Sequence, residues 1–383
     1  MHHGGTSQAG GAGVNDGQKT LAIVGLGLLG ASIAEATRKR HPGWRILGVS
    51  SPNTIKEALE FEVIDEGLGY DQVRQAVERS DLIFLCTPID HILGMLGEWE
   101  SNPPKLKPDA IVSDVGSTKA EICTLGRKVF PVGGFVGSHP MAGSEKTGLK
   151  ARDAHLFETA AWIICPENDA SEKTATDRAV LEKFVQGLGA RTLVLHPQHH
   201  DLVVALASHL PQILSTVLAA YTGSSESLPS ILEVAGGGFR DMTRLAGSSF
   251  SVWEPILESN RRNLEFILPT FRRELESFEV SLSKDGGKQF FDEANELRNH
   301  ALSPRKGFSS PTTEILLDLV DKPGALLAVL SPLAQAGLNV LDLEILKVRE
   351  GEEGVLMMGF HKPEEAQAAL NLLAKSGHKA RLR

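Results

Sequence analysis

Short apolar runs dominate the first half of the chain, and stretches of helical periodicity separate them. The runs cover residues 20–24, 45–50, 81–86, 110–114, 161–165 and 191–195. A continuous apolar run of this length is typical of a strand that is buried on both faces of a parallel sheet. A helical pattern covers about 171–188, between the last two runs. This alternation predicts an α/β fold with a Rossmann-like domain over residues 19–197.

The pattern changes after residue 197. Residues 198–300 show helical periodicity with few strand signals, and their later part is rich in apolar residues. We therefore predict an all-helical domain that binds substrate and forms a homodimer through its apolar surface. Residues 301–311 are rich in serine, proline and basic residues, which predicts a linker.

Residues 312–383 carry a compact pattern of strands and helices. Strand signals fall at 314–320, 339–348, 355–360 and 379–382, and helix signals fall at 325–336 and 363–376. The order βαββαβ predicts a ferredoxin-like domain. At the other end of the chain, residues 1–18 are rich in glycine, serine and glutamine, which predicts a disordered tail.

Composition narrows the function classes. The 383-residue chain has a formal net charge of −9, which argues against general nucleic-acid binding because that requires a basic face. Its three cysteines, Cys86, Cys123 and Cys165, have neither metal-ligand nor CxxC spacing. No apolar run reaches membrane-spanning length, and no secretory leader is evident. We expect a cytoplasmic protein that contacts neither membrane nor nucleic acid and holds no metal.

A glycine-rich segment follows the first apolar run directly. The run 20–24 leads into Gly25-Leu26-Gly27-Leu28-Leu29-Gly30, and a helical pattern continues through Lys39. In a dinucleotide site the first glycine permits a tight turn and the second lets the backbone approach the pyrophosphate. The third lets the helix pack closely on the strand, and the helix N-terminus faces the phosphates. The segment therefore predicts binding of NAD(P)+.

The end of the second strand bears on which nicotinamide cofactor binds. An NAD-binding site usually has a carboxylate there, which binds the ribose hydroxyls. Here Ser50 and Ser51 stand in its place, and neither would repel a 2′-phosphate. The sequence therefore favours NADP+. Thr87 follows the run 81–86, so we expect it at the same edge of the sheet.

One imidazole stands in the small-residue segment Gly137–Glu145. His139 follows the short apolar pair Phe135-Val136, and histidine is the commonest general base. Thr87, Ser117 and His139 all come at the ends of predicted parallel strands, so they should lie along one edge. The alternatives are a buried structural histidine and, for Ser117, a cap of the following helix.

The helical region adds candidate substrate contacts. His209 stands in an otherwise apolar helix and must have a polar partner, which a core histidine would find in the backbone. The triplet Gly236–Gly238 predicts a flexible or close-approach turn. Asp241 and Arg244 follow on one helix face, where they could form a surface salt bridge or present the guanidinium to a carboxylate.

Several motifs together carry a family resemblance. They are Gly25–Gly30, Asp114–Lys119, Ser138–Glu145, His200-Asp201 with Ser208–Pro211, and Gly237–Arg244. In this order they resemble the prephenate dehydrogenase family and its arogenate dehydrogenase relatives, over roughly residues 19–300. The segments Asp321–Leu326 and Gly337–Val340 are similar to those of an ACT domain.

The resemblance implies a reaction in tyrosine biosynthesis. Prephenate loses a hydride to the nicotinamide and its ring carboxylate as CO₂, which gives 4-hydroxyphenylpyruvate. His139 would remove the C4 hydroxyl proton, Ser117 would bind that hydroxyl or orient the imidazole, and Arg244 would hold a carboxylate. The other implied substrate-site residues are His209, Arg240, Asp241 and Glu145. The ACT-like domain implies feedback by an amino acid such as tyrosine, with Asn339 as the candidate effector contact.

Three other functions stay open from the sequence. Arogenate differs from prephenate only in its side chain, so either is a candidate substrate. A β-hydroxyacid-type dehydrogenase also joins a Rossmann domain to a helical one, but it usually relies on a lysine where this chain offers His209 and Arg244. A non-catalytic amino-acid sensor would keep the fold without turnover.

Gln212 departs from the family, which often has histidine there.

Overall fold

The computed structural model describes residues 18–143, 146–166, 171–300, 313–320, 322–346 and 354–382. The chain divides into two compact units, Met1–Lys288 and Gln289–Arg383. Apart from Gln18, the predicted tail lies outside the described residues, as do the predicted linker and Glu145.

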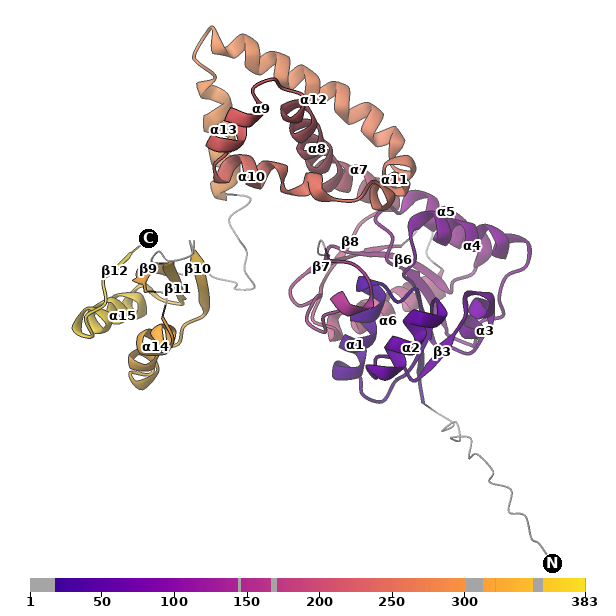
Figure 1. Cartoon of the computed structure of the whole chain (residues 1–383). Coiled ribbons are helices and arrows are strands. Elements are labelled where there is room, and N and C mark those ends of the chain that lie inside the picture. The colour runs from indigo at the N-terminus through magenta and orange to yellow at the C-terminus, as the bar shows by residue number, and fades with distance from the viewer. Residues whose placement is uncertain are drawn as a thin grey trace, which may run out of the picture. The chain divides into compact units, whose positions relative to one another are not determined.

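An eight-stranded sheet forms the centre of the N-terminal domain (Figure 1). Its strands are β1 (Thr20–Val24), β2 (Arg45–Val49), β3 (Glu66–Leu68), β4 (Leu82–Leu85), β5 (Ile111–Asp114), β6 (Phe135–Pro140), β7 (Ala161–Cys165) and β8 (Arg191–Val194). They lie in the order β3-β2-β1-β4-β5-β6-β7-β8. The predicted Rossmann-like α/β fold is confirmed.

One strand pair departs from the parallel pattern. Strand β7 pairs with β6 in the antiparallel sense, with His139 opposite Ile163. Parallel neighbours need a crossover, usually a helix, to bring the chain back to the same end of the sheet. The connection from β6 to β7 contains only the short 3₁₀ helix η2 (Leu149–Ala151) among its described residues, so β7 runs in the opposite direction.

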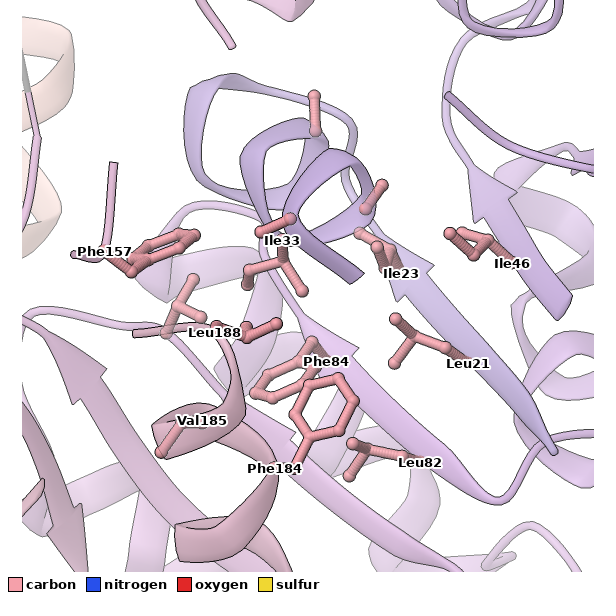
Figure 2. Packing of buried hydrophobic residues seen from close by; sticks show 14 of the residues in the cluster. Leu21, Ile23, Ile33, Ile46, Leu82, Phe84, Phe157, Phe184, Val185 and Leu188 are labelled. Carbon is pink, nitrogen blue, oxygen red and sulfur yellow. The ribbon is translucent and has the colours of Figure 1, made fainter. Parts of the chain in front are cut away.

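Helices cover both faces of the sheet. The helices are α1 (Leu28–Arg40), α2 (Pro52–Glu60) and α6 (Glu172–Gly187) on one face, and α3 (Val73–Glu78), α4 (Ile89–Ser101) and α5 (Ala120–Val129) on the other. Strand β4 contributes Phe84 to the first layer and Ile83 to the second. Figure 2 shows Phe84 beside Phe184 of α6, with their ring centroids 5.9 Å apart. Burial on both faces explains the continuous apolar runs of β1, β4 and β5. The run 191–195 is an exception, because β8 lies at the edge of the sheet and is largely exposed, so its predicted burial is wrong.

The helical domain comprises the elements from α7 to α12. They are α7 (Pro197–Val204), η3 (Ala205–His209), α8 (Leu210–Gly223), α9 (Leu228–Val234), α10 (Gly237–Thr243), η4 (Arg244–Gly247), α11 (Phe250–Ser259) and α12 (Arg261–Leu282). A further helix, α13 (Lys288–His300), follows. The turn η3 is a π-helix inside a longer helix, an irregularity that often marks functional sites. The predicted helical character of residues 198–300 is confirmed.

The continuous helix Pro197–Gly223 corrects one expectation. It spans 27 residues with a window of mean hydropathy 1.7, so among the described residues it is long and apolar enough to cross a membrane. The expectation that no apolar segment reaches that length is wrong, because it counted only uninterrupted apolar runs. The helix buries His200, Asp201 and His209, and 28% of its most apolar window is buried.

The C-terminal unit contains a four-stranded antiparallel sheet. Its elements are β9 (Thr313–Leu319), α14 (Ala325–Gln335), β10 (Asp342–Leu346), β11 (Gly354–Phe360), α15 (Pro363–Lys375) and β12 (Ala380–Leu382). The strand order is β10-β11-β9-β12. One face of the sheet packs on both helices, with Leu317, Val329 and Leu373 buried between them. The predicted βαββαβ order is confirmed.

Candidate active site

The glycine-rich loop joins β1 to α1. Gly25 has φ +101°, and a Cβ there would lie 2.8 Å from the carbonyl oxygen of Cys86. A Cβ on Gly30 would overlap the carbonyl oxygen of Gly25, so only glycine lets α1 pack this closely. A Cβ on Gly27 would meet no described heavy atom within 4 Å. The loop is therefore closely packed at Gly25 and Gly30 but open at Gly27, next to the N-terminus of α1. A pyrophosphate site requires this combination.

Thr87 lies against this loop. Its Cγ2 is 3.0 Å from the position that a Cβ on Gly25 would take, and Thr87 is only 9% exposed. Its Oγ1 atom is buried and has no hydrogen-bond partner among the described residues. A buried polar atom without a partner costs free energy unless a ligand or a water satisfies it. This hydroxyl and the open space over Gly27 both fit a bound dinucleotide.

The two serines after β2 are already engaged in the protein. Ser50 is buried, and its N–H donates to the carbonyl oxygen of Leu68 over 3.2 Å. Ser51 is exposed and caps α2, because its Oγ accepts from the N–H of Thr54 over 3.5 Å. The two residues that follow β2 are therefore both serines, and neither is a carboxylate that would bind the ribose hydroxyls of NAD+.

His139 is the penultimate residue of β6 and is 9% exposed. Its Nδ1 lies 2.9 Å from Nε2 of His200, a residue of α7 in the helical domain. The Nδ1 atom of His200 lies 2.8 Å from Oδ1 of Asp201. Burial lowers the pKa of His139 well below its usual value, and the nearby His200 and Lys119 lower it further. The imidazole is therefore neutral near pH 7, as a general base must be.

Asp201 joins the helical domain to the N-terminal domain. Its Oδ1 accepts from the N–H of Lys119 over 2.6 Å, and its Oδ2 accepts from the N–H of Ala120 over 2.9 Å. These two N–H groups are at the beginning of α5, where a helix leaves donors unsatisfied. Asp201 therefore caps α5, and the alternative cap by Ser117 is wrong. Ser117 itself lies half-buried between β5 and α5.

A buried ion pair contacts Ser138, the residue before His139. Asp114 and Lys119 are in direct contact, and both side chains are fully buried. Burial raises the pKa of Asp114, while the Lys119 ammonium and the N–H groups of Gly116 and Ser138 oppose that shift. The Ser138 hydroxyl donates to the carbonyl oxygen of Asp114 over 2.8 Å. The pair and these hydrogen bonds thus connect the loop between β5 and α5 to Ser138 of β6, the residue before His139.

His209 has the polar partner that the sequence required, but the partner is a side chain. Its Nδ1 lies 3.1 Å from Nδ2 of Asn260, which also donates to the carbonyl oxygen of Asp201. The ring of Trp253 meets the imidazole edge-to-face, with centroids 5.7 Å apart. Burial lowers the pKa of His209 to about 4, so this imidazole is also neutral near pH 7.

The segment with Arg244 differs from its sequence prediction. Gly237 begins α10, so the predicted turn is wrong because Gly237 and Gly238 are helical, and a Cβ at any of Gly236–Gly238 would meet no described heavy atom within 4 Å. Helix α10 ends at Thr243, and Arg244 begins η4. The predicted positions Arg240, Asp241 and Arg244 are all exposed.

The η4 segment is attached to α8, immediately after His209 in the chain. Nε2 of Gln212 donates to the carbonyl oxygen of Leu245 over 2.8 Å, and Oγ of Ser215 accepts from the N–H of Ala246 over 3.0 Å. Gln212, which departs from the family pattern, therefore holds the segment that carries Arg244. The sequence pattern did not predict this role of Gln212. It also did not predict that His200 contacts His139, that Asp201 caps α5 or that Asn260 contacts His209.

Three cavities lie near the predicted positions. A cavity of about 770 Å³ between α3 and α4 is lined by Thr87, and one of about 620 Å³ beside α5 and α12 is lined by Asp201. In the C-terminal unit, a cavity of about 350 Å³ is lined by residues that include Lys322, Gly324 and Ile345. Asn339 is exposed and is not among the residues that line this cavity.

Family models match most of the chain. Residues 33–194 match the nucleotide-binding domain of prephenate dehydrogenase, and residues 196–295 match its dimerization domain. Residues 313–372 match the ACT domain.

Whole proteins match as well. The prephenate dehydrogenase of Bacillus subtilis is 31% identical over 93% of this chain and 96% of its own length. A Zymomonas mobilis cyclohexadienyl dehydrogenase is 29% identical over 74% of this chain and 96% of its own.

Two solved structures each cover 73% of the chain. Synechocystis arogenate dehydrogenase aligns over 98% of its own chain, with 30% identity and a TM-score of 0.62. Prephenate dehydrogenase from A. aeolicus, in complex with hydroxyphenyl propionate and NAD+, aligns over 97%, with 25% identity and a TM-score of 0.66.

Proposed function

The chain belongs to the prephenate dehydrogenase family, and from this premise we propose how its residues divide the work of the reaction. The protein is an NAD(P)-dependent oxidoreductase of tyrosine biosynthesis. It converts prephenate to 4-hydroxyphenylpyruvate, and the observation that carries this assignment is the buried His139 at the carboxyl end of β6, with its Nδ1 in contact with His200.

In this proposal His139 is the general base. Prephenate bears a hydroxyl and a hydrogen on ring carbon C4, and His139 takes the hydroxyl proton through Nε2, since Nδ1 is bound to His200. The C4 hydrogen leaves with its electron pair to the nicotinamide ring. The C1–CO₂⁻ bond then breaks, its electrons make the ring aromatic, and the oxygen recovers a proton. The reaction therefore releases CO₂ without net proton release.

Substrate binding falls to the helical domain and to Ser117. We assign Arg244 to a substrate carboxylate because a guanidinium offers two parallel donors, and its segment is fixed on α8 by Gln212. His209 contacts the substrate from η3, and Ser117 binds the C4 hydroxyl or orients His139. The remaining assigned substrate-site residues are Arg240, Asp241 and Glu145, the last of which lies outside the described residues.

The nicotinamide cofactor, when bound, accepts the hydride. We assign its pyrophosphate to the loop Gly25–Gly30 and one of its polar groups to the unsatisfied hydroxyl of Thr87. NADP+ is our preferred cofactor, because Ser50 and Ser51 leave the end of β2 without a carboxylate that would repel a 2′-phosphate. The A. aeolicus relative was solved with NAD+, so the two cofactors must be compared directly.

The test is reduced-cofactor formation by the purified full-length protein, on prephenate or arogenate and with NAD+ or NADP+. We expect the highest kcat/KM with prephenate and NADP+. A preference for arogenate would instead make the protein an arogenate dehydrogenase. The 30% identity with the Synechocystis arogenate dehydrogenase supports this alternative. Cofactor binding without turnover on any combination would contradict the enzyme assignment and support an amino-acid sensor.

The assembly and location follow from the same family. We propose a cytoplasmic homodimer, because the helical region matches a dimerization domain and exposes apolar side chains. Val217, Tyr221 and Phe266 are among them, at 58%, 78% and 68% exposure. Large exposed apolar side chains gathered on one domain are typical of a subunit interface.

We also propose that tyrosine inhibits the enzyme through the ACT domain, with Asn339 as the effector contact. Removing residues 312–383 should leave kcat/KM within about twofold and abolish inhibition by tyrosine, because the proposed catalytic residues all precede the deletion. Initial rates over a tyrosine titration, for both lengths of chain, measure this. Equal inhibition of the truncated protein would place the effector in the active site instead.

A further inference from the structure

Three buried side chains form a line of hydrogen bonds that ends at the proposed base. Asp201 contacts His200 over 2.8 Å, and His200 contacts His139 over 2.9 Å. Their exposed fractions are 2%, 0% and 9% respectively. His139 comes from β6, and the other two come from α7, so the line exists only when the helical domain is in place.

The state of Asp201 determines where the protons in this line lie. Its carboxylate accepts two backbone N–H groups at the beginning of α5, where the helix dipole also favours negative charge. An ionised carboxylate can only accept hydrogen bonds, so Nδ1 of His200 must carry a hydrogen. With its hydrogen on Nδ1 and none on Nε2, His200 presents a lone pair at Nε2, to which Nδ1 of His139 donates.

We propose that His200 is a positioning residue, which holds His139 in the tautomer with hydrogen on Nδ1 and a lone pair on Nε2. This inference rests on the proposed role of His139 as the base. When Nε2 takes the substrate proton, the resulting imidazolium is bonded through His200 to the carboxylate of Asp201. The line therefore orients the base before the reaction, and no proton needs to leave through it.

Other charged and titratable groups surround the two imidazoles. Lys119 is paired with Asp114 and still lowers the pKa of His139, and His209 on η3 is neutral near pH 7 because burial lowers its pKa to about 4. Cys165 on β7 stays protonated because burial raises its pKa to about 12. Asp201 is therefore the nearby anion that His200 connects to His139.

The tautomers can be read directly by nuclear magnetic resonance. Long-range ¹H–¹⁵N spectra of the full-length protein, labelled at its 13 histidines, distinguish hydrogen on Nδ1 from hydrogen on Nε2. The variants His139→Asn and His200→Asn assign the two rings. At pH 8 we expect hydrogen on Nδ1 of both rings. Hydrogen on Nε2 of His139 in the unmodified protein would overturn the proposal.

Kinetics test the consequence. His200→Asn retains an amide that can donate to Asp201 but loses the acceptor for His139, so we expect kcat to fall about 100-fold with KM nearly unchanged. His200→Gln, whose longer side chain can accept from His139, should recover part of the loss.

A neighbouring position supplies the control. His199 is the exposed residue before His200 on α7, so His199→Asn should keep normal kinetics. Thermal unfolding establishes that each variant is folded. A folded His200→Asn variant with unchanged kcat and unchanged His139 tautomer would overturn the proposal. The spectra do not depend on turnover, so the two hypotheses are tested separately. If the proposed function is wrong, the comparison of substrates shows no turnover. If this inference is wrong, the spectra show hydrogen on Nε2 of His139.

Discussion

Replacing His139 with asparagine lowers kcat by at least about a thousandfold, while the dissociation constant of the cofactor stays within about twofold. Asparagine cannot accept the C4 hydroxyl proton at neutral pH, so hydride departure would have to occur from the protonated alcohol. The side chain lies on β6, whereas the glycine loop that we assign to the cofactor joins β1 to α1. Stopped-flow hydride transfer and cofactor titration followed by fluorescence measure the two quantities separately.

The pH profile of the unmodified enzyme supplies the complementary evidence. Protonated His139 cannot act as a base, so kcat/KM decreases as pH falls through its pKa. Because burial holds that pKa well below 6.5, activity should persist at pH 6.5 and decline only in more acidic solution. The acid limb should disappear from the residual activity of His139→Asn. A variant that retains most of its turnover would show that another group is the base.

Replacing Lys119 with methionine should lower the free energy of unfolding by about 3–5 kcal/mol. Methionine fills much of the lysine volume, but it leaves the fully buried carboxylate of Asp114 without its counter-charge. The penalty for an unpaired buried charge greatly exceeds the worth of an ordinary contact. Urea unfolding of the full-length protein, followed by tryptophan fluorescence, measures this change.

Two further variants distinguish charge from packing. Asp114→Asn combined with Lys119→Met removes both charges and should recover a large part of the loss. Lys128→Met breaks the exposed pair with Glu100, whose atoms are 3.4 Å apart, and should cost at most about 1 kcal/mol. If the double variant were less stable than Lys119→Met alone, charge burial would not be the cause.

The fold could be predicted closely from local sequence pattern. The strands β1, β4 and β5 lie within about one residue of the predicted runs, because burial on both faces demands continuous apolar sequence. Gly25 and Gly30 were identifiable because their roles depend on a tight turn and on close packing within one β–α unit. The C-terminal order βαββαβ was equally local.

Features that depend on distant contacts could not be predicted in the same way. The antiparallel direction of β7 depends on how residues 141–160 return to the sheet, and no periodicity encodes that. The sequence showed His200-Asp201 as the opening of a helix, but their contacts with His139 and with α5 are 61 and 81 or 82 residues apart in the chain. The roles of these polar residues emerged only when the domains were placed together.

The cap on α5 has a consequence for the order in which the chain is made. Helix α5 begins at Ala120, but the carboxylate that satisfies its first N–H groups belongs to residue 201. A nascent chain ending before α7 would have every strand of the sheet and still leave that helix uncapped and His139 without its imidazole partner. The N-terminal domain therefore acquires its last contacts only after α7 has been synthesised. The hydrogen bonds around α5 and His139 form only at that stage.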